Sequence, residues 1–141
     1  MKLSCATLVA VLGFFVTGCG KDAAYEGPPR VALSGRVTID GQTVDGGTIS
    51  FIPQSPNLRV TGGPISNGLY SIVEEKGAHE GGYRVEIRCP KPNGKKFKDS
   101  DTGEMKDQLV ESVPAKFNTK STLSVSVSPQ NSTLHFDLKS K

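Results

Sequence analysis

A repeated alternation of apolar and polar residues, with a period of two, constrains the fold of this chain more than any other feature. The clearest run is YRVEIRC at 83–89, and further runs lie at 123–128 (LSVSVS) and 134–139 (LHFDLK). Successive side chains of a β-strand point to opposite faces, so each run buries one face and leaves the other in water. This pattern is typical of antiparallel sheets packed on one side. No stretch has a convincing helical period, and 105–113 is the only candidate for a turn of helix.

Turn-forming residues separate these runs. Glycine and proline together contribute 25 residues, and Asp40-Gly41 and Asn67-Gly68 are dipeptides typical of tight hairpin turns. The sequence therefore predicts an all-β fold, a seven-stranded antiparallel β-sandwich. The predicted strands span residues 31–40, 47–53, 58–66, 69–74, 82–90, 121–128 and 133–139.

One segment does not alternate. Residues 91–120 form a long insertion rich in lysine, aspartate and glycine, and they are predicted to be a long loop. Loops of this length without secondary structure of their own are usually either functional or disordered. At its end, Pro114–Asn118 is expected to pin the loop onto the sandwich, with Phe117 buried and Asn118 closing a turn.

The N-terminus has the pattern of a secretory signal peptide, predicted over residues 1–18. A positive Met1-Lys2 precedes an apolar run of 14 residues, Leu3 to Val16, whereas about 20 apolar residues are needed to span a bilayer. The run ends in Val16-Thr17-Gly18-Cys19, which resembles the bacterial lipobox of an aliphatic residue, two small residues and a cysteine. That resemblance implies cleavage before Cys19 and a diacylglycerol thioether on its sulfur. A chance cysteine behind an ordinary signal peptide is the alternative.

The predicted mature chain is a tether at 19–30 followed by a single domain at 31–141. Lipidation of Cys19 predicts a location in the cell membrane or outer membrane, on the periplasmic or extracellular face. The glycine at position 20, where some lipoproteins have aspartate, favours the outer membrane by resemblance to Gram-negative sorting signals. Because Cys19 carries lipid in this interpretation, Cys89 has no partner and a disulfide framework is excluded.

The domain itself resembles the carboxypeptidase regulatory-like, transthyretin-like family in its turn and core positions. The family pattern matches a G-R-V-T strand, D-G and G-G turns, an N-G-x-Y segment and a G-Y-x-V strand. The resemblance implies a prealbumin-like sandwich that is non-catalytic and aids folding or binding. The matching residues are Gly35–Thr38, Asp40-Gly41, Gly46-Gly47 to Pro53, Asn67–Tyr70 and Gly82–Val85.

The charge pattern argues against nucleic-acid binding. The net charge is +3, and the basic cluster of Lys91, Lys95, Lys96 and Lys98 is followed at once by acidic residues. Nucleic-acid binding requires a concentrated basic surface. Tryptophan is absent and aromatic residues are few, which removes stacking platforms as well.

No residue set specifies a reaction, a cofactor or a metal. His79 and His135, the only histidines, are interpreted as surface residues, and Cys89 as an inert core thiol. Residues 99–104 (DSDTGE) resemble a calcium loop, but the spacing of glycine and of the last acid does not fit.

The predicted function is therefore that of a membrane-anchored, non-enzymatic cell-envelope lipoprotein acting as a binding or structural module. Its expected partners are the membrane, through the lipid on Cys19, and an envelope protein. The alternative is a calcium-dependent ligand binder or a hydrolase that uses loop 91–112.

Overall fold

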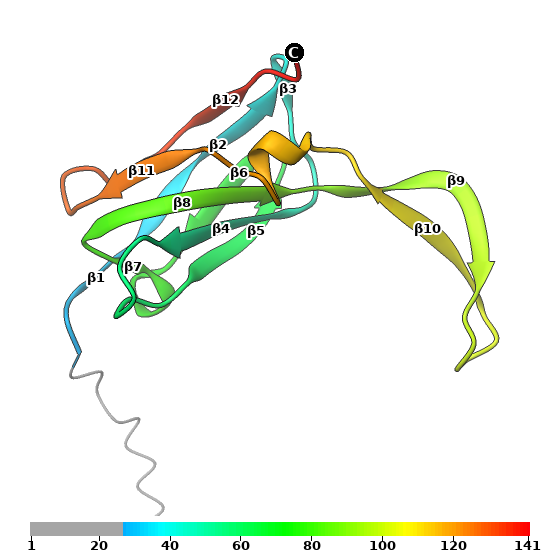
Figure 1. Cartoon of the computed structure of the whole chain (residues 1–141), viewed down its shortest axis with the longest axis horizontal. Coiled ribbons are helices and arrows are strands. Elements are labelled where there is room, and N and C mark those ends of the chain that lie inside the picture. The colour runs from blue at the N-terminus through cyan, green and yellow to red at the C-terminus, as the bar shows by residue number, and fades with distance from the viewer. Residues whose placement is uncertain (1–26) are drawn as a thin grey trace, which may run out of the picture.

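The computed structural model describes residues 27–141, which are almost entirely β-strand and irregular structure (Figure 1). Two 3₁₀-helices of one turn each, η1 (Glu74–Lys76) and η2 (Ala115–Phe117), are the only helices in this part of the chain. Neither approaches the length or the apolar character that crossing a membrane requires. The strands are β1 (Arg30–Val31), β2 (Leu33–Ile39), β3 (Gln42–Thr43), β4 (Thr48–Pro53), β5 (Thr61–Ser66), β6 (Leu69–Ile72), β7 (Ala78–His79), β8 (Gly81–Arg88), β9 (Pro90–Lys98), β10 (Met105–Glu111), β11 (Ser124–Val127) and β12 (Phe136–Leu138).

All seven predicted strands are present, and they form one continuous hydrogen-bonded path. Its order is β11-β8-β4-β5-β6-β2-β12, with β3 paired to β2 off this path. Every neighbouring pair on the path is antiparallel except β12 and β2, which run parallel with Phe136 opposite Val37. β11 lies at one end of the path and β12 at the other, so these two consecutive strands are not hairpin partners.

The sheet curls at β5, which pairs with two different strands along its length. Its first part, from Thr61 to Pro64, pairs with β4, and its last two residues, Ile65 and Ser66, pair with β6. Gly62 allows the close approach to β4, since a Cβ at this position would lie 2.3 Å from the carbonyl oxygen of Ile49. The curl brings β6, β2 and β12 across from β4, β8 and β11 in a sandwich-like, all-β arrangement (Figure 1).

The core lies between these layers, and Phe51 of β4 is its central contact. The Phe51 ring is fully buried, with ring centroids 5.9 Å from Tyr70, 6.4 Å from Phe136 and 6.5 Å from Tyr83. The Tyr70 hydroxyl donates a 2.8 Å hydrogen bond to the carbonyl oxygen of Leu134. The alternating apolar residues of the predicted strands supply the rest of the core, including Leu33, Val37, Ile49, Ile65, Ile72, Val85, Ile87, Val127 and Leu138.

The prediction of a long loop over 91–120 is wrong for most of its length. Residues 90–111 form the β9–β10 hairpin, which projects from the body of the fold (Figure 1). The turn of helix considered for 105–113 is also wrong, because Met105–Glu111 is strand β10. Every residue of both strands is exposed, so no burial pattern marks them in the sequence.

Replacing Phe51 with alanine is expected to destabilise the domain by about 3–5 kcal/mol, the usual cost of truncating a buried aromatic residue. Urea unfolding followed by circular dichroism measures the change. Leu69→Ala is the control, because the Leu69 side chain is 59% exposed and its truncation is expected to change stability by less than about 0.5 kcal/mol. Equal effects of the two substitutions would contradict this description of the core.

Candidate functional site

Cys19, the one residue to which the sequence assigns a chemical role, lies outside the described residues 27–141. The first strand of the domain is β1, and the eleven residues 20–30 separate Cys19 from Val31. The other candidate groups lie within the described domain.

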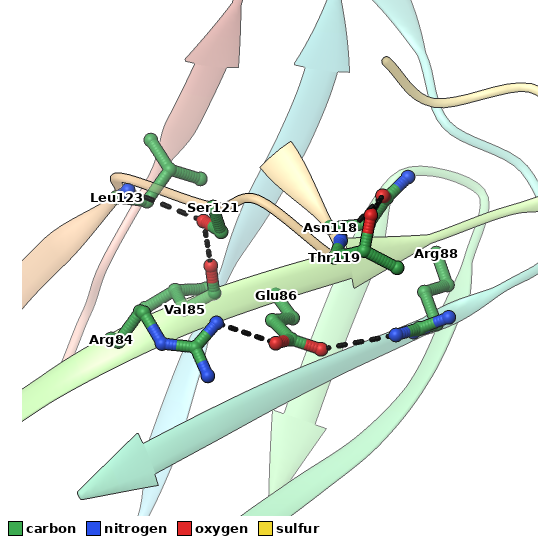
Figure 2. Close-up of polar contacts among 8 residues, drawn as sticks. All are labelled: Arg84, Val85, Glu86, Arg88, Asn118, Thr119, Ser121 and Leu123. Atoms are coloured by element: carbon green, nitrogen blue, oxygen red, sulfur yellow. Dashed lines mark hydrogen bonds and ion pairs between the residues drawn. The ribbon is translucent and has the colours of Figure 1, made fainter. Parts of the chain in front are cut away.

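A row of three charged residues lies on the outer face of β8 (Figure 2). Glu86 accepts hydrogen bonds from Arg84 on one side and from Arg88 Nη2, at 3.2 Å, on the other. The hydrogen bond from Arg84, followed by the contributions of Arg88, lowers the pKa of the Glu86 carboxyl below its ordinary value, against the effect of burial. An ionised carboxylate between two guanidinium groups is poorly suited to accept or donate a proton. The alternation of the sequence predicted this polar face, but not the pairing within it.

A second polar cluster attaches residues 118–123, which follow the β9–β10 hairpin and η2, to β8 (Figure 2). Asn118 is buried, and its Nδ2 donates a 2.8 Å hydrogen bond to the carbonyl oxygen of Val113. The Ser121 hydroxyl donates to the carbonyl oxygen of Val85 and accepts from the Leu123 N–H at 3.2 Å. Among residues 27–141, no buried side-chain nitrogen or oxygen lacks a hydrogen-bond partner, so this cluster holds the segment in place.

The expectations for 114–118 are partly confirmed. The Asn118 N–H donates to the carbonyl oxygen of Ala115, which closes the predicted turn. Phe117 was expected to be buried, but it is only half-buried, packed against the core with the Lys116 Nζ 5.0 Å from its ring centroid. The main anchors of this segment are instead polar groups and the buried Val113.

The two histidines lie in different surroundings. His135 is exposed, as expected, and its Nδ1 accepts a 3.0 Å hydrogen bond from the Arg36 N–H. The expectation that His79 is a surface residue is wrong. The pairing of β7 with β1 covers His79, whose Nδ1 lies 3.2 Å from the carbonyl oxygen of Pro29.

Cys89 follows β8 and is buried with the core residues, as its place in the alternation predicts. Its Sγ lies 2.8 Å from the carbonyl oxygen of Gly46, to which the thiol donates. Within the described part of the chain it is a free cysteine. Burial keeps this sulfur from substrates in solvent.

The segment that resembles a calcium loop is the tip of the β9–β10 hairpin. Asp99 Oδ1 accepts the N–H groups of Asp101, at 2.9 Å, and Thr102, at 3.0 Å, and its Oδ2 accepts from the Lys106 ammonium. These bonds, with Lys106 contributing most, lower the pKa of Asp99 to about 2. Both carboxylate oxygens therefore stabilise a turn. Within residues 27–141 no three His, Cys, Asp or Glu side chains are grouped as metal ligands.

Two surface depressions of residues 27–141 each contain one histidine. An open depression of about 560 Å³ lies on the outer side of β2 and β6, and its titratable side chains are His135 and Tyr70. A smaller one of about 300 Å³ contains His79 with three basic residues and Glu75, and Arg30 there donates to the carbonyl oxygen of Glu75. The two histidines thus lie in separate depressions and do not form a pair.

Comparison of the chain with protein-family models, with curated proteins and with solved structures finds no match.

Replacing Glu86 with glutamine is expected to destabilise the domain by about 1 kcal/mol, because two guanidinium groups then lie beside an uncharged amide. The pKa of Glu86 is lowered in the folded state, so its contribution is complete above the pKa of the unfolded chain and is lost as pH falls through the folded value. The difference between the two proteins is thus expected to be constant above about pH 5.5 and to shrink below about pH 4.3. Urea unfolding over this pH range measures it. Glu80→Gln is the control, because the Glu80 carboxylate is exposed, and it is expected to leave stability unchanged. An effect of Glu86→Gln that does not vary with pH would contradict the ion-pair interpretation.

Proposed function

We propose that this chain is a lipid-anchored protein of the bacterial cell envelope whose β-domain serves as a non-enzymatic binding or structural module. The observation that carries the proposal is the Val16–Cys19 seam, at which an apolar segment too short to span a bilayer ends in a cysteine that follows two small residues. The proposed mature chain begins at Cys19, whose sulfur bears the lipid.

The distance from Cys19 to the domain supports this arrangement. Residues 20–30 are polar and end in Pro28-Pro29-Arg30, and when fully extended they reach about 35–40 Å. That length is sufficient to hold a domain clear of lipid headgroups. Several acyl chains on one cysteine anchor a protein stably, whereas a single chain is marginal.

The fold proposed for the domain is a seven-stranded, transthyretin-like sandwich. Its support is the seven-strand path, together with the positions of the motif residues. Asp40-Gly41 and Asn67-Gly68 both form turns with positive φ, from 50° to 81°, as the resemblance requires. Gly35 lies where a Cβ would approach the Leu134 carbonyl oxygen to 1.8 Å, so this motif glycine has a packing role.

A non-enzymatic role is favoured by the state of the polar groups. The four carboxylates with lowered pKa values all hold structural contacts. These are Glu86 between two arginines, Asp99 in a turn, Asp137 with the Thr38 hydroxyl at 2.7 Å, and Asp40 with the Ser140 N–H at 3.1 Å. An acid or base with a pKa near neutrality is what general acid–base catalysis requires. We therefore propose that the module acts by binding other molecules through its surface.

The anchor is tested by growing bacteria that express the full chain with an alkyne analogue of palmitate. The unaltered chain is expected to be labelled and found with the membranes, and Cys19→Ala is expected to abolish the label and leave an uncleaved precursor. Cys5→Ala is the matched control, because Cys5 lies within the proposed leader and is removed with it. Labelling of the Cys19→Ala protein would overturn the lipid anchor.

The calcium alternative makes a different prediction for the purified protein. Because both Asp99 oxygens accept hydrogen bonds from the hairpin tip, adding calcium is expected to release no heat of binding and to leave the melting temperature unchanged. Isothermal titration calorimetry and differential scanning calorimetry measure these quantities. A saturable heat that disappears in Asp99→Asn would contradict the proposal and favour a metal-dependent binder.

A further inference from the structure

The β9–β10 hairpin is the part of the domain that the core does not stabilise. A two-stranded hairpin is marginally stable in water by itself, and both of its edges leave backbone groups unpaired. All sixteen residues of its two strands are exposed. The hairpin thus has the character of an arm that packs against something outside its own domain.

The surface of this arm is unusually apolar for an exposed ribbon. Of seven large hydrophobic residues exposed in the described chain, the arm contributes Phe97, Met105, Leu109 and Val110, which are 46–60% exposed. By the alternation of the two strands, Met105 and Leu109 lie on one face of the ribbon and Phe97 and Val110 on the other, so each face presents two large apolar side chains to solvent.

The base of the arm is firmly attached, so its direction is set by the domain. Glu111 Oε1 accepts hydrogen bonds from the Cys89 N–H at 2.8 Å and from the Val113 N–H at 3.0 Å. Ser112 also bonds to the Cys89 carbonyl oxygen through its N–H and its hydroxyl. Cys89 and Val113 are both buried, so these bonds join the arm to the core. A pre-organised arm loses less entropy on binding than a mobile loop does.

The lysines of the arm lie mainly on β9, and its acids lie in the turn and on β10. β9 contains four lysines and no acid, the turn at 99–104 contains three acids, and β10 contains two acids and one lysine. The arm as a whole is neutral. An anionic surface or a nucleic acid attracts β9 but is repelled by the acids of the turn and of β10, so neither matches the whole arm. A second copy of the same arm matches it, provided that β9 of one copy lies opposite β10 of the other.

The register allows this match on one face of the ribbon. Alternation along β10 places Met105, Asp107, Leu109 and Glu111 on the same face. Their cross-strand partners on β9 are Lys98, Lys96, Pro92 and Pro90, with a register shift between Asp107 and Leu109 that both copies share. A twofold axis running along the ribbon exchanges the two columns, so that each Lys96 meets an Asp107 and each Leu109 meets a Pro92 of the other copy.

We propose that the chain forms a homodimer through this face of its β9–β10 hairpins, with the Lys96 of each copy opposite the Asp107 of the other and Leu109 at the apolar centre. Lys96 and Asp107 are accessible for this contact, since their side chains are 61% and 52% exposed and their 3.7 Å ion pair lies at the surface. In this arrangement both arms point the same way from their domains. The dimer contact does not involve the lipid proposed at Cys19. It adds one partner, a second copy of the chain, to the proposed function.

The test is the mass of the full chain in detergent, by sedimentation equilibrium with the detergent density-matched and micelles in excess. The unaltered chain is expected to be a dimer, and Leu109→Ser is expected to weaken it about tenfold or more. Leu69→Ser is the matched control, because Leu69 is equally exposed but lies on β6, off the arm. A monomeric unaltered chain, or equal effects of the two substitutions, would overturn the proposal.

A charge-complementation experiment separates the dimer contact from the ion pair within one arm. Lys96→Glu and Asp107→Lys each place like charges both within the arm and across the proposed interface, so each variant alone is expected to be monomeric. Mixing the two restores opposite charges across the interface only, and a heterodimer is expected to form. Circular dichroism checks that each variant is folded. Variants that stay dimeric alone, or folded variants that stay monomeric when mixed, would rule out this interface.

Discussion

The contacts of Phe51 with aromatic residues of both layers are the interaction on which the rest of the domain depends. Phe51 lies on β4, near the middle of the strand path, and its ring meets Tyr83 of the adjacent strand β8 and Tyr70 and Phe136 of the opposite layer. Burying these rings requires the sheet to curl, and β5 provides the curl by pairing with β4 and then with β6. The burial of one face per strand also decides which polar side chains remain outside.

The outer surface that results is rich in ion pairs and hydrogen bonds that are already satisfied. Glu86 is neutralised by two arginines, and Asn118 and Ser121 complete the backbone pairing beside β8. Such groups stabilise a fold but have little capacity left for chemistry. The β9–β10 arm differs, because its two strands pair only with each other within the domain described and its four large apolar side chains are 46–60% exposed. The polar groups beside β8 are already hydrogen-bonded, whereas the arm is exposed along both strands. We therefore assign the proposed interaction surface to the arm.

Sequence reasoning succeeded wherever burial imposes a pattern, and it failed where burial is absent. All seven core strands were predicted because one face of each must be apolar. The sequence predicts a loop where the structure has the arm, because KPNGKKFK shows no alternation. Its strand is held by backbone bonds and by the Asp99 turn and not by packing. His79 was misassigned for a related reason: the β1 strand that covers it is too short, at two residues, to leave a signal.

The sequence by itself determined the all-β class, the turns at Asp40-Gly41 and Asn67-Gly68, the apolar face that includes Cys89, and the seam at Cys19 on which the proposed anchor rests. These features depend on local backbone geometry and on period-two burial, which are properties of short segments. Only the tertiary structure decided the parallel β12–β2 pair, the split pairing of β5 and the projecting arm. Those features depend on which distant segments meet, and on the packing of Phe51 between layers that the linear order of residues does not specify.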